Sequence, residues 1–307
     1  MLSFRRGTPI AEIQKGNKVV KTVYVTDIDN EKSDIDSPVR DQVLPKSFYT
    51  NLRNINAVNM ILLKKAIRES KPDIMPRNAN MHEAYKQAQL LLEDLLRKYI
   101  QIPKEQGTVQ PIPIAESFRF AIFGPSGVGK STFLGRLMME YKKKYKKNDI
   151  FVVSALTEDE AFEKAKPIYV KLDESVITDP MSIKEFKNSM VCFDDIESIT
   201  NKALKEAVFR FRDECLQVGR HENIATVCIA HGILMGAESK VLLNESDEVC
   251  VFPRSNFSAI TNLVKRYYGF GRDDVNYLKE LGQRSRWAVV KRSFPSCIIG
   301  EQEVKVL

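Results

Sequence analysis

Short apolar runs alternate with amphipathic segments along the chain from about residue 118 onward. Each run has the length of a strand, and the segments between the runs carry apolar side chains at helical spacing. This alternation is typical of a parallel sheet covered by helices. The strands expected in this sheet are Phe118–Phe123, Ile150–Ser154, Ile168–Leu172, Met190–Phe193, Ala225–Ala230 and Glu248–Phe252. We also expect a helix over Lys202–Val218 and two edge strands that form a hairpin, Arg286–Lys291 and Cys297–Gly300.

A helical pattern precedes the sheet. Apolar side chains recur at helical spacing over Phe48–Ser70 and again over Met81–Ile100, and the prolines at 72 and 76 predict a break between them. The sequence therefore predicts two helices. The segment Pro103–Pro113 is rich in Pro, Gln and Gly, so we expect it to be a linker.

The first 46 residues are polar and irregular. They contain one strand-like segment, Lys18–Thr26, and an acidic stretch around Asp27–Asp36. They predict a flexible or peripheral arm. The expected organisation is an arm over residues 1–46, a helical region with its linker over 47–113, and an α/β domain over 114–307.

Composition narrows the class of protein. With 307 residues, of which 43% are hydrophobic, the chain can bury a substantial core. Its five cysteines are widely spaced and lie mostly in apolar runs, so they predict buried thiols of a reducing compartment rather than disulfides or a zinc site. The amino-terminal segment has no apolar core of signal-peptide length, and no run of about 18 apolar residues occurs. We therefore expect a cytoplasmic protein, neither secreted nor inserted in a membrane.

The net charge of +7 is basic enough to suggest a polyanionic partner. Basic residues cluster in two places and could neutralise phosphates of a nucleic acid there. For the first cluster, an equal alternative is a solvated helix end whose lysines complement the helix dipole. The first cluster is Lys142, Lys143, Lys144, Lys146 and Lys147, and the second is Arg284, Arg286, Lys291 and Arg292.

A glycine-rich loop directly follows the first expected strand. Glycines let successive backbone N–H groups point at phosphate oxygens, which the positive end of the following helix also attracts. We expect Lys130 to reach the β- and γ-phosphates of ATP and the Ser131 hydroxyl to ligate Mg²⁺. The predicted nucleotide-binding residues are Gly124, Pro125, Ser126, Gly127, Val128, Gly129, Lys130, Ser131 and Thr132.

Two adjacent carboxylates end the expected strand Met190–Phe193. Asp194 stands at the strand tip, where it can hold Mg²⁺, and Asp195 is placed to polarise the attacking water. A buried strand that ends in two acids is costly unless a cation is near. Because many motor ATPases carry Glu at the position of Asp195, Glu197 is the alternative catalytic acid.

Two further residues are candidates for catalysis. His231 ends the strand Ala225–Ala230, which would lie between the phosphate loop and the acidic strand, so it could sense the γ-phosphate; alternatively, it bonds nearby backbone. Arg220 follows Gly219, an expected helix stop, and could reach the γ-phosphate of a neighbouring subunit. A surface ion pair is the alternative for Arg220, and the rival arginines are Arg210, Arg212 and Arg254.

The combination of motifs resembles the packaging-type ATPases of nucleocytoplasmic large DNA viruses, which belong with the FtsK and HerA translocases. The resemblance spans roughly residues 118–300. It rests on Gly-Pro-Ser-Gly-Val-Gly-Lys-Ser at 124–131, Phe-Asp-Asp-Ile at 193–196, Gly-Arg-His-Glu-Asn-Ile at 219–224, the strand ending in His231, Phe-Pro-Arg-Ser at 252–255 and Ser-Arg-Trp at 285–287. His231 departs from the pattern, since many relatives of FtsK carry Gln there.

The resemblance implies a P-loop NTPase with a central, mostly parallel sheet of the additional-strand, RecA-like class, flanked by helices. It implies an ATPase that uses ATP and Mg²⁺ to move double-stranded DNA, as a ring of identical subunits such as a hexamer. For a viral protein, it further implies genome packaging, capsid or portal partners, and a place in the host cytoplasm (the viral factory) or the virion. Lys130 and Ser131 then contact phosphate and Mg²⁺, Asp194 is the metal carboxylate, Asp195 the catalytic acid and Arg220 an arginine finger.

Two other functions remain open at this stage. One is a different P-loop phosphotransferase, although such enzymes usually begin at the loop, which about 120 residues precede here. The other is a nucleotide-binding structural component without motor activity. A GTPase is disfavoured, because the motifs Asn-Lys-x-Asp and Asp-x-x-Gly do not follow the loop. The lone Trp287 could stack on a base, but a place in the strand core is favoured.

Overall fold

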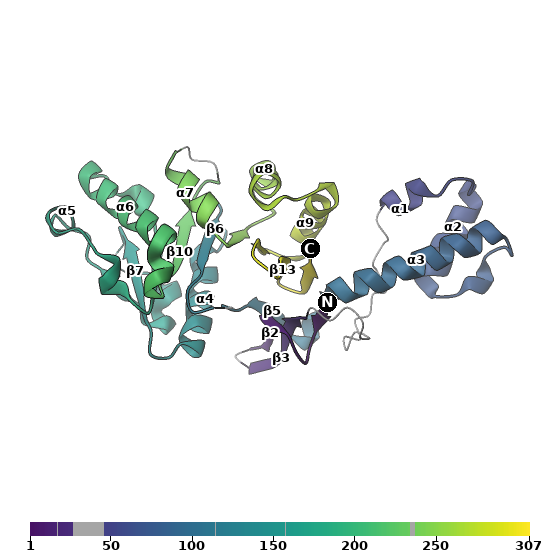
Figure 1. Ribbon diagram of the computed structural model, residues 1–307, viewed down its shortest axis with the longest axis horizontal. Helices are drawn as coiled ribbons and strands as arrows, with labels where there is room; N and C mark the ends of the chain where they lie inside the picture. The colour runs from purple at the N-terminus through teal and green to yellow at the C-terminus, as the bar shows by residue number, and fades with distance from the viewer. Residues whose placement is uncertain (17, 27–45, 114, 157, 234–236) are drawn as a thin grey trace.

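The computed structural model describes residues 1–16, 18–26, 46–113, 115–156, 158–233 and 237–307 (Figure 1). Its largest element is a ten-stranded sheet of order β4-β14-β13-β12-β11-β6-β10-β9-β7-β8. Six neighbouring strands are parallel, and they are β11 (Glu248–Val251), β6 (Arg119–Phe123), β10 (Ala225–Ala230), β9 (Ser189–Asp194), β7 (Asp149–Ser154) and β8 (Ile168–Val170). This confirms the predicted mostly parallel sheet and places β10 between β6 and β9, as the additional-strand class requires.

Four antiparallel strands extend the sheet beyond β11. The predicted terminal hairpin forms β12 (Ala288–Lys291) and β13 (Cys297–Gly300), which pair with each other. Two strands that the sequence analysis did not predict complete the edge, β14 (Glu303–Val306) and β4 (Tyr99–Gln101). The hairpin therefore lies inside the sheet and not at its edge, because β14 and β4 cover it.

Helices cover both faces of the large sheet. Alternate residues of β6 point to opposite faces, so Phe120 packs in one core cluster with α4 and Phe123 in the other with the later helices. The helix α4 (Lys130–Lys144) and the short η3 (Glu160–Ala165) lie on the first face. The second face carries α5 (Ser175–Thr178), α6 (Lys202–Val218), α7 (Ala237–Glu245), α8 (Phe257–Tyr268) and α9 (Arg272–Arg284). The predicted helix over Lys202–Val218 is confirmed as α6.

The amino-terminal segment and the later strand β5 form a second, smaller sheet of order β1-β3-β2-β5. Its strands are β1 (Leu2–Ser3), β2 (Thr8–Lys15), β3 (Lys18–Val25) and β5 (Thr108–Pro111). The strand predicted near Lys18–Thr26 is confirmed as β3. Of the two predicted alternatives, a flexible or a peripheral arm, the first is wrong for residues 1–16 and 18–26, because Leu2, Ile10 and Ile13 are buried in the same core cluster as α4. The linker prediction also fails at β5, which pairs with β2. The acidic stretch around Asp27–Asp36 lies outside the described residues.

Three helices form the predicted helical region. The segment Phe48–Ser70 contains two helices rather than one, α1 (Lys46–Asn51) and α2 (Ala57–Glu69), since Asn56 caps a new helix start by accepting a hydrogen bond from the Asn59 N–H. The second predicted helix is α3 (Ala79–Lys98), which ends where β4 begins. Its Met81 and Tyr85 pack against Leu63 of α2. The remaining short helical turns are η1 (Pro72–Ile74), η2 (Lys104–Gln106), η4 (Ile183–Phe186), η5 (Ile196–Ser198) and η6 (Gly219–Glu222).

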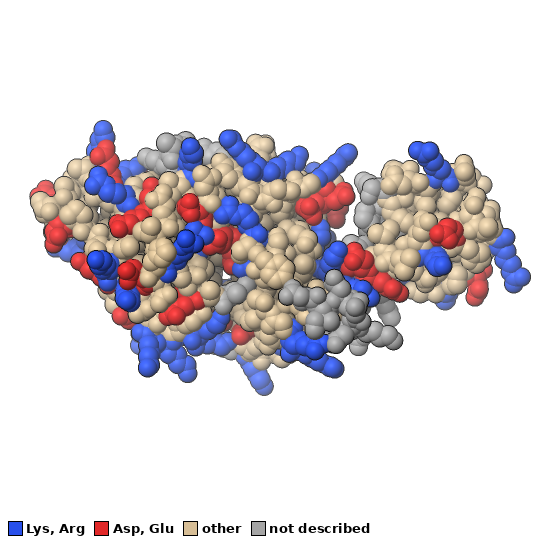
Figure 2. All heavy atoms as spheres, in the orientation of Figure 1, with Lys and Arg blue, Asp and Glu red and all other residues tan. Residues whose placement is uncertain are grey.

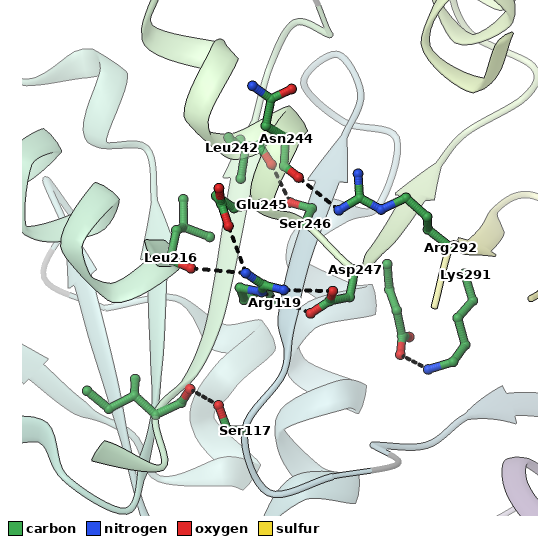
Figure 3. A network of polar contacts seen from close by, with 12 residues as sticks. Ser117, Arg119, Leu216, Leu242, Asn244, Glu245, Ser246, Asp247, Lys291 and Arg292 are labelled. Atoms are coloured by element: carbon green, nitrogen blue, oxygen red, sulfur yellow. Dashed lines mark hydrogen bonds and ion pairs between the residues drawn. The ribbon is translucent and has the colours of Figure 1, made fainter. Parts of the chain in front are cut away.

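A network of ion pairs fixes the amino-terminal ends of the parallel strands (Figure 3). The Arg119 guanidinium on β6 donates to both Asp247 carboxylate oxygens at 2.9 Å and to Glu245 Oε2 at 2.8 Å. On the neighbouring hairpin, Lys291 is buried and pairs with Glu248 at 2.7 Å. Arg119 thus ties β6 to the turn between α7 and β11, which keeps the strand that carries the glycine-rich loop in register.

Much of the second basic cluster is engaged within the protein. Arg284 pairs with Glu303, Arg286 with Glu301 and Lys291 with Glu248, while Arg292 donates to the Asn244 carbonyl. A nucleic-acid role for this cluster is therefore disfavoured, since binding phosphate would break these pairs.

Two other sequence expectations can be compared with the structure. All five cysteines are buried free thiols, as predicted. Among the described residues, none of the helices combines the length and the apolar character that crossing a membrane requires.

Candidate active site

The glycine-rich loop leaves β6 and enters α4 at the carboxyl edge of the parallel strands. Gly127 and Gly129 have φ angles of 79° and 103°, a backbone conformation that favours glycine, and they turn the chain into the helix. Gly124 has no room for a side chain, because a Cβ there would lie 2.9 Å from Val128 and 3.0 Å from the Phe252 ring. The loop therefore has the sequence and the backbone of a phosphate-binding loop at a helix amino terminus. Phe252, directly after β11, supports the loop, a role that the sequence motif at 252–255 did not reveal.

Lys130 begins α4 and is 7% exposed. Its ammonium donates to the Pro125 carbonyl at 3.0 Å and to His231 Nδ1 at 3.3 Å. Burial lowers the pKa of this lysine, while Asp195, Asp194 and Glu197 act to raise it. The amine is thus held over the loop by partners that a bound phosphate could replace.

Asp194 ends β9, two strands away from β6, and is 4% exposed. Burial raises the pKa of its carboxyl to about 6, and the neighbouring Asp195 and Asp159 act in the same direction. Within the described ranges, no donor group forms a hydrogen bond to this carboxylate, which is unusual for a buried acid. The contribution of Asp159, which lies beyond β7, was not foreseen from sequence.

These residues fit a magnesium ion that is bound together with a nucleotide. The described part of the chain contains no group of three or more His, Cys, Asp or Glu side chains that could hold a metal ion by themselves. Mg²⁺ at such sites keeps several waters and takes phosphate oxygens, so one hydroxyl and one carboxylate suffice from the protein. Ser131, in the first turn of α4, and the buried Asp194 are the residues of the expected types.

Asp195 and Lys130 are bridged by His231. The imidazole Nε2 lies 2.8 Å from Asp195 Oδ1, and Nδ1 lies 3.3 Å from the Lys130 ammonium and from the Ser126 hydroxyl. Since the ammonium can only donate, Nδ1 accepts, which assigns the tautomer with the proton on Nε2 donating to Asp195. The strand β10 thereby connects the loop lysine to the second acid.

Glu197 also borders this cluster. Its Oε2 lies 3.5 Å from the backbone nitrogen of His231, and its carbonyl accepts from Lys205 at 3.0 Å. The structure therefore brings five predicted residues together around the loop, and they are Lys130, Asp194, Asp195, Glu197 and His231. Which of the two acids activates water stays a prediction.

Arg220 is separated from this cluster. The helix α6 starts after β9 and runs back to the amino-terminal ends of the strands, so the exposed Arg220 in η6 lies at the far end of the sheet from its own loop. Gly219 ends α6, as expected, although with a right-handed φ of −54°; the left-handed cap is Asn223, which ends the following η6. Arg220 is therefore placed away from the loop of its own subunit, and its role as an arginine finger stays a prediction.

Two of the three rival arginines form ion pairs or hydrogen bonds within the protein. Arg212 is buried and pairs with Asp213 at 2.6 Å. Arg254 donates to the carbonyls of Gly282 and Gln283. Trp287 is 5% exposed and packs edge-on against Phe133, which places it in the core as the sequence analysis favoured. Arg210 is exposed and stays a rival to Arg220.

The buried Asp194 predicts a pH dependence of stability in the nucleotide-free protein. With its pKa near 6 in the fold and near 4 when unfolded, the folded protein binds more protons between these values, so the free energy of unfolding falls as pH rises through this window. Asp194→Asn should remove this pH dependence. Above pH 7, the free energy of unfolding of the variant should exceed that of the wild type by about 2 to 3 kcal/mol. The difference should vanish below about pH 4.

Urea unfolding from pH 4 to 8 in the presence of a chelator measures this difference. Asp179→Asn, at an exposed position, is the matched control and should show no pH-dependent gain. If Asp194→Asn raised the free energy of unfolding by the same amount at every pH, the raised pKa of Asp194 would be contradicted.

The loop between β6 and α4, the acidic end of β9 and the strand β10 between them define a P-loop NTPase fold of the additional-strand class. The chain is 31% identical over 209 residues to the protein described as uncharacterized protein V3 of Sputnik virophage, a match that covers 67% of this chain and 83% of that protein. The chain therefore belongs to the family of this virophage protein, which agrees with the viral resemblance of the motifs.

Among solved structures, the chain is similar to the genome packaging NTPase B204 of Sulfolobus turreted icosahedral virus 2. That similarity has 13% identity, a TM-score of 0.41, and covers 60% of this chain and 97% of that chain. It is also similar to the pCW3 conjugation coupling protein TcpA, with 11% identity, a TM-score of 0.42, and coverage of 67% of this chain and 66% of that chain. No protein-family model matches the sequence.

Proposed function

We propose that this protein is an ATPase that translocates double-stranded DNA and packages a viral genome into its capsid. The observation that carries the proposal is the bridge from Lys130 through His231 to Asp195 at the edge of the sheet. It joins a phosphate-binding residue to a catalytic acid through a strand inserted between them. The motif resemblance at 124–131, 193–196 and 219–224 and the family match to a virophage protein support the packaging role.

The site residues have distinct roles in this proposal. The loop N–H groups and Lys130 bind the phosphates of ATP, and Lys130 exchanges its contacts with Pro125 and His231 for phosphate oxygens. Ser131 and Asp194 hold Mg²⁺, which supplies charge neutralisation at the phosphates. Asp195 orients and deprotonates the attacking water, with Glu197 as the alternative base.

In this proposal, His231 couples the binding of ATP to the activation of water by Asp195. Because its Nδ1 accepts from Lys130 while its Nε2 proton binds Asp195, withdrawal of the lysine toward phosphate frees Nδ1 and leaves the acid oriented. The histidine thus acts as the sensor that relates the phosphates to the catalytic acid.

The proposed protein works as a ring of identical subunits, such as a hexamer, with Arg220 completing the neighbouring site. We place it in the host cytoplasm or the virion, with capsid or portal proteins as partners. The position of Arg220 at the opposite end of the sheet from its own loop supports a contribution between subunits.

Steady-state ATP hydrolysis with and without long double-stranded DNA tests this function. The assay is run at two salt concentrations and several protein concentrations. A translocase gives DNA stimulation that fades with salt and rises cooperatively with protein concentration. Flat, DNA-independent hydrolysis would favour a phosphotransferase, and an absence of turnover would favour a structural component.

Arg220→Ala should leave ATP affinity nearly intact and lower turnover about tenfold or more, but only in assembled protein. The side chain is exposed and remote from its own loop, so a monomer should not depend on it. Turnover measured across protein concentrations, with Arg210→Ala as the matched exposed variant on α6, separates the two arginines. An equal loss for Arg220→Ala in isolated monomers would exclude action between subunits.

A further inference from the structure

Lysines from two distant parts of the chain form one surface, which we call the lysine ridge. One part is the β2–β3 hairpin and the other is the carboxyl end of α4 with the turn that follows it. The ridge consists of Lys15, Lys18, Lys21, Lys142, Lys143, Lys144, Lys146 and Lys147. Figure 2 shows Lys and Arg side chains gathered along the lower rim of the molecule, beneath α4 and the β2–β3 hairpin.

Direct contacts hold the two parts of the ridge together. Glu12 on β2 accepts from Lys143 at 2.8 Å, and Gln14 on the same strand donates to Glu140 of α4 at 2.7 Å. Lys144 donates to the Pro113 carbonyl at 2.6 Å, next to β5. The hairpin and the helix end are therefore parts of one continuous surface.

The charge of the ridge is largely uncompensated. Three acids near the ridge form ion pairs with Lys142 and Lys143, and they are Glu12, Glu140 and Asp149. Throughout the part of the chain that the structure describes, no acid pairs with the other exposed lysines of the hairpin and the turn, which are Lys15, Lys18, Lys146 and Lys147.

We propose that the lysine ridge binds the phosphate backbone of double-stranded DNA. Charge complementarity favours a polyanion, and lysines on flexible stems suit the sequence-independent phosphate contacts that a translocase needs. A protein partner would be expected at a surface enriched in aromatic and arginine anchors and depleted of lysine. This inference deepens the proposed translocase function and rests on it for the identity of the polyanion.

The position of the ridge also connects it to the nucleotide. The single helix α4 begins with Lys130 in the loop and ends with Lys144 in the ridge. Its 15 residues span about 22 Å, so the DNA surface and the phosphate site lie at opposite ends of one rigid element. A small rotation of α4 on nucleotide binding would move the ridge against the DNA.

Two double variants test the ridge, Lys15→Gln with Lys18→Gln on the hairpin and Lys146→Gln with Lys147→Gln beside α4. The matched control is Lys265→Gln with Lys279→Gln, which removes two exposed lysines from α8 and α9. Thermal unfolding first checks that all three proteins are folded. Affinity for a double-stranded DNA fragment is then measured by fluorescence anisotropy from 50 to 200 mM salt, without nucleotide.

We expect each ridge variant to bind DNA about tenfold or more weakly at 100 mM salt, with the salt slope reduced by about two, because two phosphate contacts are lost. The control should stay within about twofold of wild type. Ridge variants that bind as tightly as the control would overturn the proposal, and so would a wild-type protein with no affinity for DNA. Weakened binding to anionic phospholipid vesicles, with unchanged DNA affinity, would also overturn it.

The DNA-affinity and ATP-hydrolysis measurements together distinguish failure of the ridge proposal from failure of the translocase proposal. If the ridge variants lose DNA affinity but DNA does not stimulate ATP hydrolysis by the wild type, the ridge is a DNA-binding surface and the translocase is excluded. If DNA stimulates hydrolysis and the ridge variants bind normally, the translocase stands and DNA contacts another surface.

Discussion

Lys130→Ala is expected to abolish measurable nucleotide binding, which corresponds to a loss of about a hundredfold or more in affinity. Lys130 is the buried cation of the loop, and its ammonium already lies within hydrogen-bond distance of the Pro125 carbonyl above the loop. Without it, the β- and γ-phosphates lose their charge-assisted partner. The fold should survive the change, because burial already disfavours the lysine charge and the buried Asp194, whose pKa is raised, can take up a proton when it loses this nearby cation.

Titration with a fluorescent ATP analogue measures this loss. Lys202→Ala is a suitable control, since Lys202 is a highly exposed lysine at the start of α6 and its charge is removed at the same carboxyl edge of the sheet. Wild-type affinity in Lys130→Ala would overturn the assignment of the loop as the nucleotide site. Weak binding in both variants would indicate a nonspecific charge effect.

Asp195→Asn should bind ATP with Mg²⁺ at near wild-type affinity and hydrolyse it about a hundredfold or more slowly. The amide keeps the size of the side chain and can still accept the His231 proton through its oxygen, but it cannot take a proton from water. Asp195 has a left-handed φ of 51°, which asparagine tolerates well, so the backbone should not change.

Single-turnover hydrolysis, compared with Glu197→Gln, identifies the catalytic acid. Unimpaired hydrolysis by Asp195→Asn together with slow hydrolysis by Glu197→Gln would move the role to Glu197, whose carboxylate lies 3.5 Å from the His231 backbone nitrogen. Loss in both variants would indicate that the two acids orient the water jointly.

The central sheet could be predicted because its strands are buried on both faces. The run Ala225–Ala230 is apolar except for Thr226 and is buried throughout, and it forms β10 with those bounds. The expected position of β10 between the loop strand and the acidic strand was also correct, which placed His231 near the loop. The hydrogen bonds that join His231 to Asp195 and Lys130 could not be predicted, because they depend on distances between side chains of different strands, which the sequence does not give.

The strands β2 and β4 were missed for physical reasons. The strand β2 carries irregularities in its pairing with β3 between Pro9 and Ala11 and between Ile13 and Gln14, so buried residues do not alternate regularly along it. The strand β4 directly continues the apolar pattern of α3, which hid the change from helix to strand at Tyr99. The helix α8, in contrast, shows helical spacing in its buried Ile260, Leu263 and Val264, and the pattern could have revealed it.

The continuity of α3 with β4 has a mechanical consequence. The helix passes into the edge strand of the large sheet without an intervening loop, and Figure 1 shows it extending from the sheet to α1 and α2. Its 20 residues measure about 30 Å, so a tilt of about 10° at its base would displace its far end by about 5 Å. A tilt of the edge strand would therefore be transmitted through this helix and would be largest at α1 and α2.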